Sequence, residues 1–304
     1  MEKDIERKRP VKIVVIIIIL LAAGYFAFRL IGNWHKRGID TAIDRQKKVW
    51  QVEENALKEK MATLLEELRL QKEGTVSEEK LFEAFGDDAT LIFPGKKVNC
   101  DVLGRQIKAF YGYLDQKDYI QAYHLEYGTF GFFQEAEKGL SEVFPVLIGE
   151  TRDLFTLLRN LAHFYRVLGK KRLTLIQEML KNEAEIIEPA MAIFYAWFTH
   201  DDDCKVEKVS PPALKVLYEY SGYFLNTIGG RSYLFRIDSK IRTLISYYSV
   251  LILDKANEKA INPYGIDIRP FIDFLTYDIG SRKGLVYQKQ YLSELEVLRR
   301  KYTL

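Results

Sequence analysis

Apolar and polar positions divide this 304-residue chain into three stretches. Residues 13–31 are almost entirely apolar, residues 39–73 place apolar side chains seven positions apart, and residues 102–304 repeat them at helical spacing. The alternation that is typical of β-strands is scarce. The pattern predicts an all-α protein in three parts: a single transmembrane helix, a long amphipathic or coiled-coil-like stalk helix, and an irregular helical bundle or degenerate helical solenoid.

The first stretch has the length and composition of a membrane anchor. A helix needs about 20 apolar residues to cross the hydrocarbon core of a bilayer. The 19 residues 13–31 meet this requirement if Arg29 extends its charged end to the headgroups. The residues expected to define the anchor are Ile13, Phe28, Arg29 and Trp34, the last at the depth where aromatic side chains favour the interface.

A cleavable signal peptide is the alternative, because Ala22, Ala23 and Gly24 supply small residues behind a short apolar core. Cleavage would leave an exported, soluble helical protein. Basic residues flank the stretch on both sides, so the positive-inside rule does not decide the topology alone. We favour a cytoplasmic tail at 1–12, an anchor in a bacterial-type inner membrane and a periplasmic C-terminal domain, since a densely basic tail beside the first span is usually retained in the cytoplasm.

Residues 39–73 contain neither glycine nor proline and read as one long helix. The apolar positions that would form an oligomer seam are Ile43, Trp50, Leu57, Leu64 and Leu68. The seam is only partly apolar, because the second set of heptad positions holds Asp40, Lys47 and Glu54. Two interpretations stay open: a coiled coil that joins copies of the chain or binds a partner helix, and a single helix packed on its own domain.

Residues 74–101 are predicted to be a connector with one short helix, which begins after Ser77 and ends at Phe85. An all-α domain then fills residues 102–304. Pro145 and Pro189 are expected to kink or split their helices. The further helices are expected at about 102–114, 119–126, 140–168, 171–199, 212–226, 233–256, 270–278 and 285–301.

Charge and cysteine content exclude several classes of function. Residues 1–48 hold 11 Lys and Arg against 5 Asp and Glu, whereas the remainder holds 34 against 37. The basic excess therefore lies beside the predicted anchor, and no basic stripe indicates nucleic-acid binding. Only Cys100 and Cys204 occur, which is too few for a disulfide framework or a thiolate metal site. The two can pair in an oxidising compartment.

Candidate chemistry is sparse, and we assign no catalytic residue and no cofactor. His200, Asp201 and Asp203 are weak candidates for metal ligands, because adjacent residues on one loop do not converge on an ion and no second ligand motif completes the shell. His163 is expected on an exposed basic face, opposite an apolar stripe of leucines.

Two further motifs favour structural roles. Glu183, Glu185 and Glu188 are expected on a solvated face, although paired carboxylates can serve acid–base chemistry. The run 229–232, Gly-Gly-Arg-Ser, favours a plain turn between helices over an anion site. Tyrosine-rich stretches near residues 218–224 and 247–248 are expected to be mostly core.

These observations favour a membrane-anchored binding, scaffolding or assembly module, integral to the membrane, with a protein partner or a second copy bound through the stalk. An anchored metal-dependent hydrolase that uses His200 is the alternative from another class. A sensor or signalling subunit is a third, but no signalling motif lies in residues 1–12.

Overall fold

The computed structural model describes residues 76–86, 98–146, 153–200 and 204–302. The chain divides into two compact units, Met1–Lys72 and Glu73–Leu304, and every described residue belongs to the second. All regular elements within the described ranges are helices, beside one isolated bridge between Val206 and Val209, so the predicted all-α fold is confirmed.

No helix in the described part of the chain is long and apolar enough to cross a bilayer. The predicted anchor at 13–31 and the predicted stalk at 39–73 lie outside the described residues. Ile13, Phe28, Arg29 and Trp34 therefore stay predictions, as do the seam positions Ile43, Trp50, Leu57, Leu64 and Leu68.

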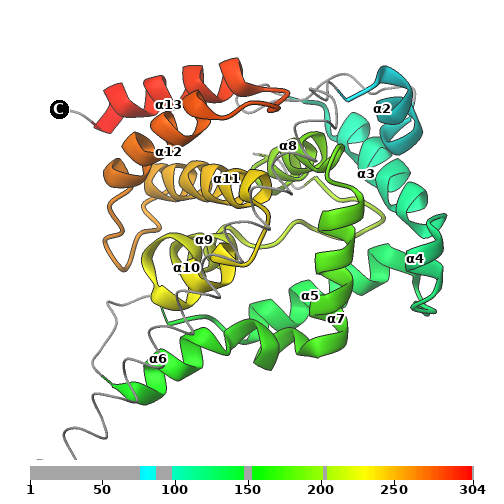
Figure 1. Ribbon diagram of the computed structural model, residues 1–304, viewed down its shortest axis with the longest axis horizontal. Helices are drawn as coiled ribbons and strands as arrows, with labels where there is room; N and C mark the ends of the chain where they lie inside the picture. Colours follow the sequence, from blue (N-terminus) through cyan, green and yellow to red (C-terminus); the bar gives the residue numbers. More distant parts are fainter. Residues whose placement is uncertain (1–75, 87–97, 147–152, 201–203, 303–304) are drawn as a thin grey trace, which may run out of the picture. The chain divides into compact units, whose positions relative to one another are not determined.

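The unit begins with four helices: α2 (Glu78–Phe85), α3 (Cys100–Asp115), α4 (Asp118–Gln121) and α5 (Gly128–Glu142) (Figure 1). Side chains stabilise the first two at their N-termini, as Ser77 accepts a hydrogen bond from the Lys80 amide and Asn99 accepts one from the Asp101 amide. Helix α2 packs on α3, so this short helix belongs to the helical unit.

The middle of the unit consists of α6 (Leu154–Leu161), α7 (His163–Asn182) and α8 (Ile187–Phe198). The prediction of one helix at 140–168 and another at 171–199 is wrong. The chain leaves helical geometry at Ala162, kinks at Gly169 with φ 73°, and turns again at 183–186. Pro189 lies in the first turn of α8, where its missing amide costs no helical hydrogen bond.

The C-terminal helices are α9 (Leu214–Asn226), α10 (Ile228–Phe235), α11 (Ser239–Glu258), α12 (Arg269–Ser281) and α13 (Gln288–Tyr302). Helix α11 lies in the middle of the view and contacts α8, α9, α10 and α12 (Figure 1). The predicted turn at 229–232 is instead the start of α10. A Cβ atom at Gly230 would lie 1.8 Å from the Tyr223 carbonyl oxygen, so glycine is required for α10 to approach α9.

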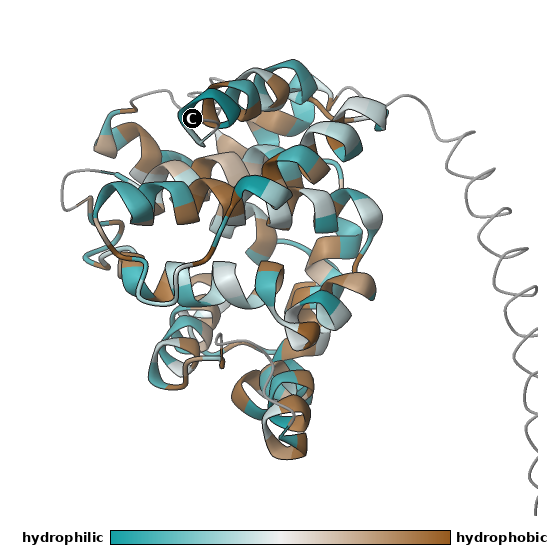
Figure 2. Ribbon diagram, turned by 90° about the vertical axis from the view of Figure 1, so that its left-hand side faces the viewer, coloured by the Kyte–Doolittle hydropathy of each residue, from teal (hydrophilic) through white to brown (hydrophobic). Residues whose placement is uncertain are grey.

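Helices of the unit carry hydrophobic residues on one side and hydrophilic residues on the other (Figure 2). Their inward faces form two hydrophobic clusters. The first involves α2, α3, α4, α5, α7 and α8, and the second involves α5 and α7 to α13. Helices α5, α7 and α8 contribute to both clusters and therefore join them.

The corner between α7 and α8 buries two carboxylates. Glu183 accepts hydrogen bonds from the hydroxyls of Tyr113 and Tyr119 at 2.7 and 3.0 Å. Glu188 is fully buried, accepts the amides of Val286 and Tyr287 at 3.0 and 2.9 Å, and lies 3.3 Å from the Lys240 ammonium.

The predicted solvated face is therefore wrong for Glu183 and Glu188, because their hydrogen-bond and ion-pair partners come from elements far away in the chain. The prediction of a solvated position is correct for Glu185, which is exposed and pairs with Lys80. Each buried carboxylate forms hydrogen bonds that offset the cost of removing it from water.

We expect Glu188→Ala to lower the free energy of unfolding by about 3 kcal/mol, because it leaves two buried amides and the Lys240 charge without their acceptor. Urea unfolding followed by circular dichroism measures this loss. Glu185→Ala is the matched control and should cost at most about 1 kcal/mol, since it removes one exposed ion pair. Equal losses in the two variants would contradict the buried role of Glu188.

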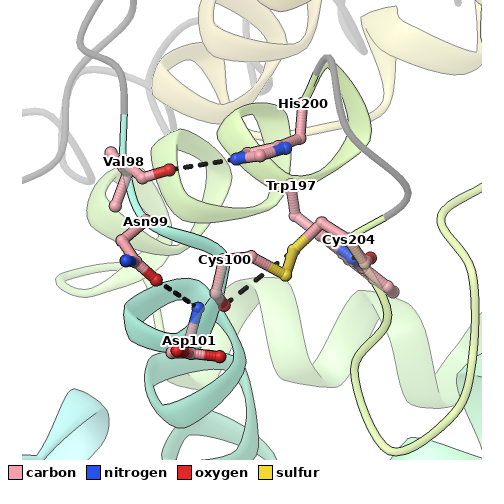
Figure 3. Close-up of a disulfide and its surroundings, with 7 residues drawn as sticks. All are labelled: Val98, Asn99, Cys100, Asp101, Trp197, His200 and Cys204. Atoms are coloured by element: carbon pink, nitrogen blue, oxygen red, sulfur yellow. Dashed lines mark hydrogen bonds between the residues drawn. A yellow bond between two sulfur atoms is a disulfide. The ribbon is translucent and has the colours of Figure 1, made fainter.

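Cys100 and Cys204 form a disulfide between the first residue of α3 and the segment after α8 (Figure 3). Their Cα atoms are 5.5 Å apart, within the usual range for a disulfide. Two hydrogen bonds support the junction: Trp197 Nε1 donates to the Cys204 carbonyl oxygen at 2.7 Å, and His200 Nε2 donates to the Val98 carbonyl oxygen at 3.1 Å. The bond closes a loop with a sequence separation of 104.

We expect Cys204→Ala to lower the free energy of unfolding by about 2–4 kcal/mol, because the open chain gains conformational entropy when it unfolds. Urea unfolding with and without dithiothreitol measures the effect. The reductant should destabilise the parent chain by a similar amount and leave the variant unchanged. A parent chain that dithiothreitol does not affect would contradict a stabilising disulfide.

Candidate functional site

One candidate site is an apolar groove whose larger cavity lies between α5, α7, α8, α9 and α11 and whose smaller cavity also borders α3. It consists of two adjoining cavities of about 400 and 220 Å³, which share five lining residues. We call their union the aromatic groove. The shared residues are Phe133, Glu137, Phe194, Phe198 and Pro212.

Four helices each present one face to the larger cavity, with side chains at positions i, i+3, i+4 and i+7. Helix α7 adds Phe164 and Ile176. This is the spacing with which helices usually pack on one another, yet here the four faces surround a space that no side chain fills. The residues are Phe133, Ala136, Glu137 and Leu140 on α5; Met191, Phe194, Tyr195 and Phe198 on α8; Leu217, Tyr220, Ser221 and Phe224 on α9; and Ile245, Tyr248, Ser249 and Ile252 on α11.

Few polar groups line the groove. Glu137 is the charged residue that borders both cavities, and its carboxylate accepts the Ser141 hydroxyl at 2.5 Å. The Tyr220 hydroxyl already donates within the protein, to the carbonyl oxygens of Leu140 or Val143 at 2.9 and 3.0 Å. A molecule in the groove would therefore be held by apolar contacts, with one carboxylate near it.

A buried histidine contacts Tyr220, one of the lining residues of the groove. The predicted exposed position of His163 is wrong: its side chain is buried, contacts Tyr220 and Tyr223, and lies beside Phe164. A continuous helix would place His163 on the outer side, but the backbone at Ala162 is not helical. This break between α6 and α7 turns the His163 side chain toward the core. Much of the leucine stripe opposite it, Leu154, Leu158 and Leu161, is exposed to solvent instead, whereas Leu168 is buried.

The contacts of His163 define its protonation. Arg166 approaches Nδ1 at 3.0 Å, and a guanidinium only donates, so Nδ1 accepts. The proton is therefore on Nε2, which donates to the Tyr220 hydroxyl at 3.0 Å. Burial, followed by the positive charges of Arg166 and Arg159, lowers the pKa of His163 from 6.5 to about 4.

The candidate metal ligands are not brought together with a second set of donors. His200 donates to the Val98 carbonyl, next to the disulfide, while Asp201 and Asp203 lie outside the described residues. Among the residues that the structure does describe, no group of three or more His, Cys, Asp or Glu side chains could hold a metal ion.

The aromatic stretches of the sequence indicated only some of the residues that line the groove. The tyrosine-rich stretch near 218–224 contributes Tyr220 and Phe224 to the lining, whereas Tyr218 and Tyr223 are core, as expected. The lining residues of α5 and α8 carried no separate signal, because an apolar helical face has the same sequence pattern whether a helix or an empty space lies opposite.

Comparison of the chain with protein-family models, with curated proteins and with solved structures finds no significant match.

We expect the free energy of unfolding to fall by about 2 kcal/mol between pH 7 and pH 5 on account of His163. The unfolded chain takes up a proton as the pH falls through 6.5, whereas the folded histidine does so only near 4, so acid favours unfolding across that window. Urea unfolding at pH 7, 6 and 5 measures the change.

The variant His163→Gln retains a donor and an acceptor without the titration, and should lose this part of the pH dependence. If parent and variant show the same slope between pH 7 and 5, His163 does not have a lowered pKa.

Proposed function

We propose that this chain is a membrane-anchored binding module that holds a hydrocarbon chain in the aromatic groove. The observation that carries the proposal is the pair of adjoining cavities, the larger of which is walled by apolar faces of five helices. Ligand sites in proteins typically measure about 300–1,000 Å³, are mostly apolar, and occur between the helices of bundles.

The lining favours a hydrocarbon chain over a peptide. An extended peptide carries an amide and a carbonyl in each residue, and apolar walls would leave these groups without partners. One turn of a helix about 10 Å across occupies roughly 400 Å³, which is about the volume of the larger cavity, so only some side chains of a complete helix could enter. A hydrocarbon chain has no polar group to satisfy.

Glu137 bears on the charge of the ligand's head group. Its carboxylate borders both cavities, so it disfavours a ligand with a carboxylate near this point and tolerates a neutral or cationic head. We therefore propose a neutral or cationic amphiphile as the ligand class. The groove would bind this ligand without reacting with it.

The anchor and the stalk complete the proposal. The 19-residue apolar segment 13–31 supports attachment to a bacterial-type inner membrane, with residues 1–12 in the cytoplasm and the helical unit in the periplasm. The disulfide supports an oxidising compartment, since such bonds persist mainly outside the cytoplasm. The heptad positions of residues 39–73 support assembly through the stalk.

Photolabelling of the full chain in phospholipid vesicles tests the ligand. We expect a long-chain alkyl alcohol with a diazirine group to label peptides of α8 and α9, and an excess of unlabelled alcohol to suppress this labelling. Ala136→Phe places a ring in the larger cavity and should reduce the labelling at least about fivefold. Mass spectrometry of the peptides measures the extent.

Three controls make this test specific. Phe274→Ala changes an exposed ring on α12, away from the groove, and should leave the labelling unchanged. Ile245→Trp fills the same cavity from α11 and guards against misfolding of the first variant. Glu137→Gln should increase competition by a fatty acid but not by the alcohol. Labelling that the alcohol cannot suppress would overturn the hydrocarbon ligand and favour a protein segment as the occupant.

A further inference from the structure

Helix α6 presents large apolar side chains to solvent. The exposed fractions are 63% for Leu154, 82% for Phe155, 52% for Leu158, 45% for Leu161 and, at the start of α7, 53% for Tyr165. The spacing of the three leucines places them on one side of the helix. We call these five residues the α6 face.

The α6 face is held outward by packing on the other side of the helix. Helix α6 contacts α10, and a Cβ atom at Gly229 would lie 2.5 Å from the Asn160 backbone, so glycine permits a close contact there. Asn160 is buried, and its carbonyl accepts the Tyr223 hydroxyl at 2.5 Å. In Figure 1, α6 lies at the lower edge of the helical unit. The exposure of its leucines therefore does not come from a detached helix.

The N-terminus of α6 is also well formed. Asp153 accepts the amides of Phe155 and Thr156 and the Thr156 hydroxyl, at 2.7 to 3.2 Å. These hydrogen bonds lower the pKa of Asp153, because they favour its charged form. The short helix is thus fixed at both ends with its apolar side outward.

Basic residues predominate in the chain segments that form α6 and the helices packed on it, although Arg166 and Arg231 hydrogen-bond within the protein. Residues 153–172 and 228–242, which include α6, α10 and the starts of α7 and α11, contain nine Lys and Arg against two Asp. Arg172 and Lys240 pair with Glu135 and Glu188, and both aspartates cap helices. The residues from 49 to 304 are by contrast slightly acidic, with 34 basic against 37 acidic side chains.

Exposed apolar side chains surrounded by cations are the combination that binds the interface of an anionic membrane. The apolar side chains enter the headgroup region, and the cations attract the lipid phosphates. A protein partner with an apolar groove would explain the leucines but not the excess of positive charge. We infer that the α6 face docks on an anionic bilayer surface, with Arg159 among the cations that strengthen the contact.

Hydrogen exchange tests this docking in the full chain, reconstituted in vesicles of phosphatidylglycerol or of phosphatidylcholine alone. We expect the amides of α6 to exchange about tenfold more slowly in phosphatidylglycerol. Phe155→Glu with Leu158→Glu should abolish the difference. Arg159→Gln should weaken the docking about fivefold, since each cation near the surface contributes about that factor.

The matched control is Phe274→Glu, which changes another exposed ring, on α12, and should leave α6 protection intact. Exchange of the buried α11 amides reports whether each variant is folded. Equal α6 exchange in the two lipids would overturn the inference. So would protection that rises with protein concentration, because it would assign the α6 face to a second copy of the chain.

Discussion

Burying two carboxylates within six residues is costly unless each receives partners, and this requirement connects the α7–α8 corner to four other parts of the helical unit. Glu183 binds tyrosines of α3 and α4, whereas Glu188 binds α11 and the backbone just before α13. The N-terminal helices and the C-terminal helices contact different ends of one short turn. The relative placement of the two hydrophobic clusters follows from these contacts, because apolar packing alone is not directional.

The α7–α8 corner also explains why a groove is present. Helix α8 contributes to both clusters, and α5 and α9 approach it from different sides without closing on it. Protein interiors are normally packed as densely as organic crystals, so four helical faces around an unfilled space lose dispersion contacts. The Tyr220 hydroxyl in the lining donates within the protein, and the mostly apolar lining suits the groove to an apolar occupant.

Local signals in the sequence predicted some helix starts and the fold class, but not the helix bounds between residues 128 and 198. Ser77 caps α2 as expected, Pro189 begins a new helix, and the all-α class follows from the apolar spacing. Long-range features were not predictable, because a residue's partners across the fold leave no mark on its neighbours in sequence. His163 shows this most clearly: one residue of non-helical backbone at Ala162 changes its environment from solvent to core. The groove likewise depends on five helices whose apolar faces look like ordinary core faces in the sequence.

The disulfide has a mechanical consequence for the helical unit. A pull between α2 and α13 passes from Cys100 directly to Cys204 through the covalent bond, so α3 to α8 carry none of the load. The bypassed segment, with a sequence separation of 104, would otherwise extend by roughly 350 Å at about 3.4 Å per residue. While the bond is intact, tension acts on the segment before Cys100 and on α9 to α13, whereas the α7–α8 corner lies inside the protected loop.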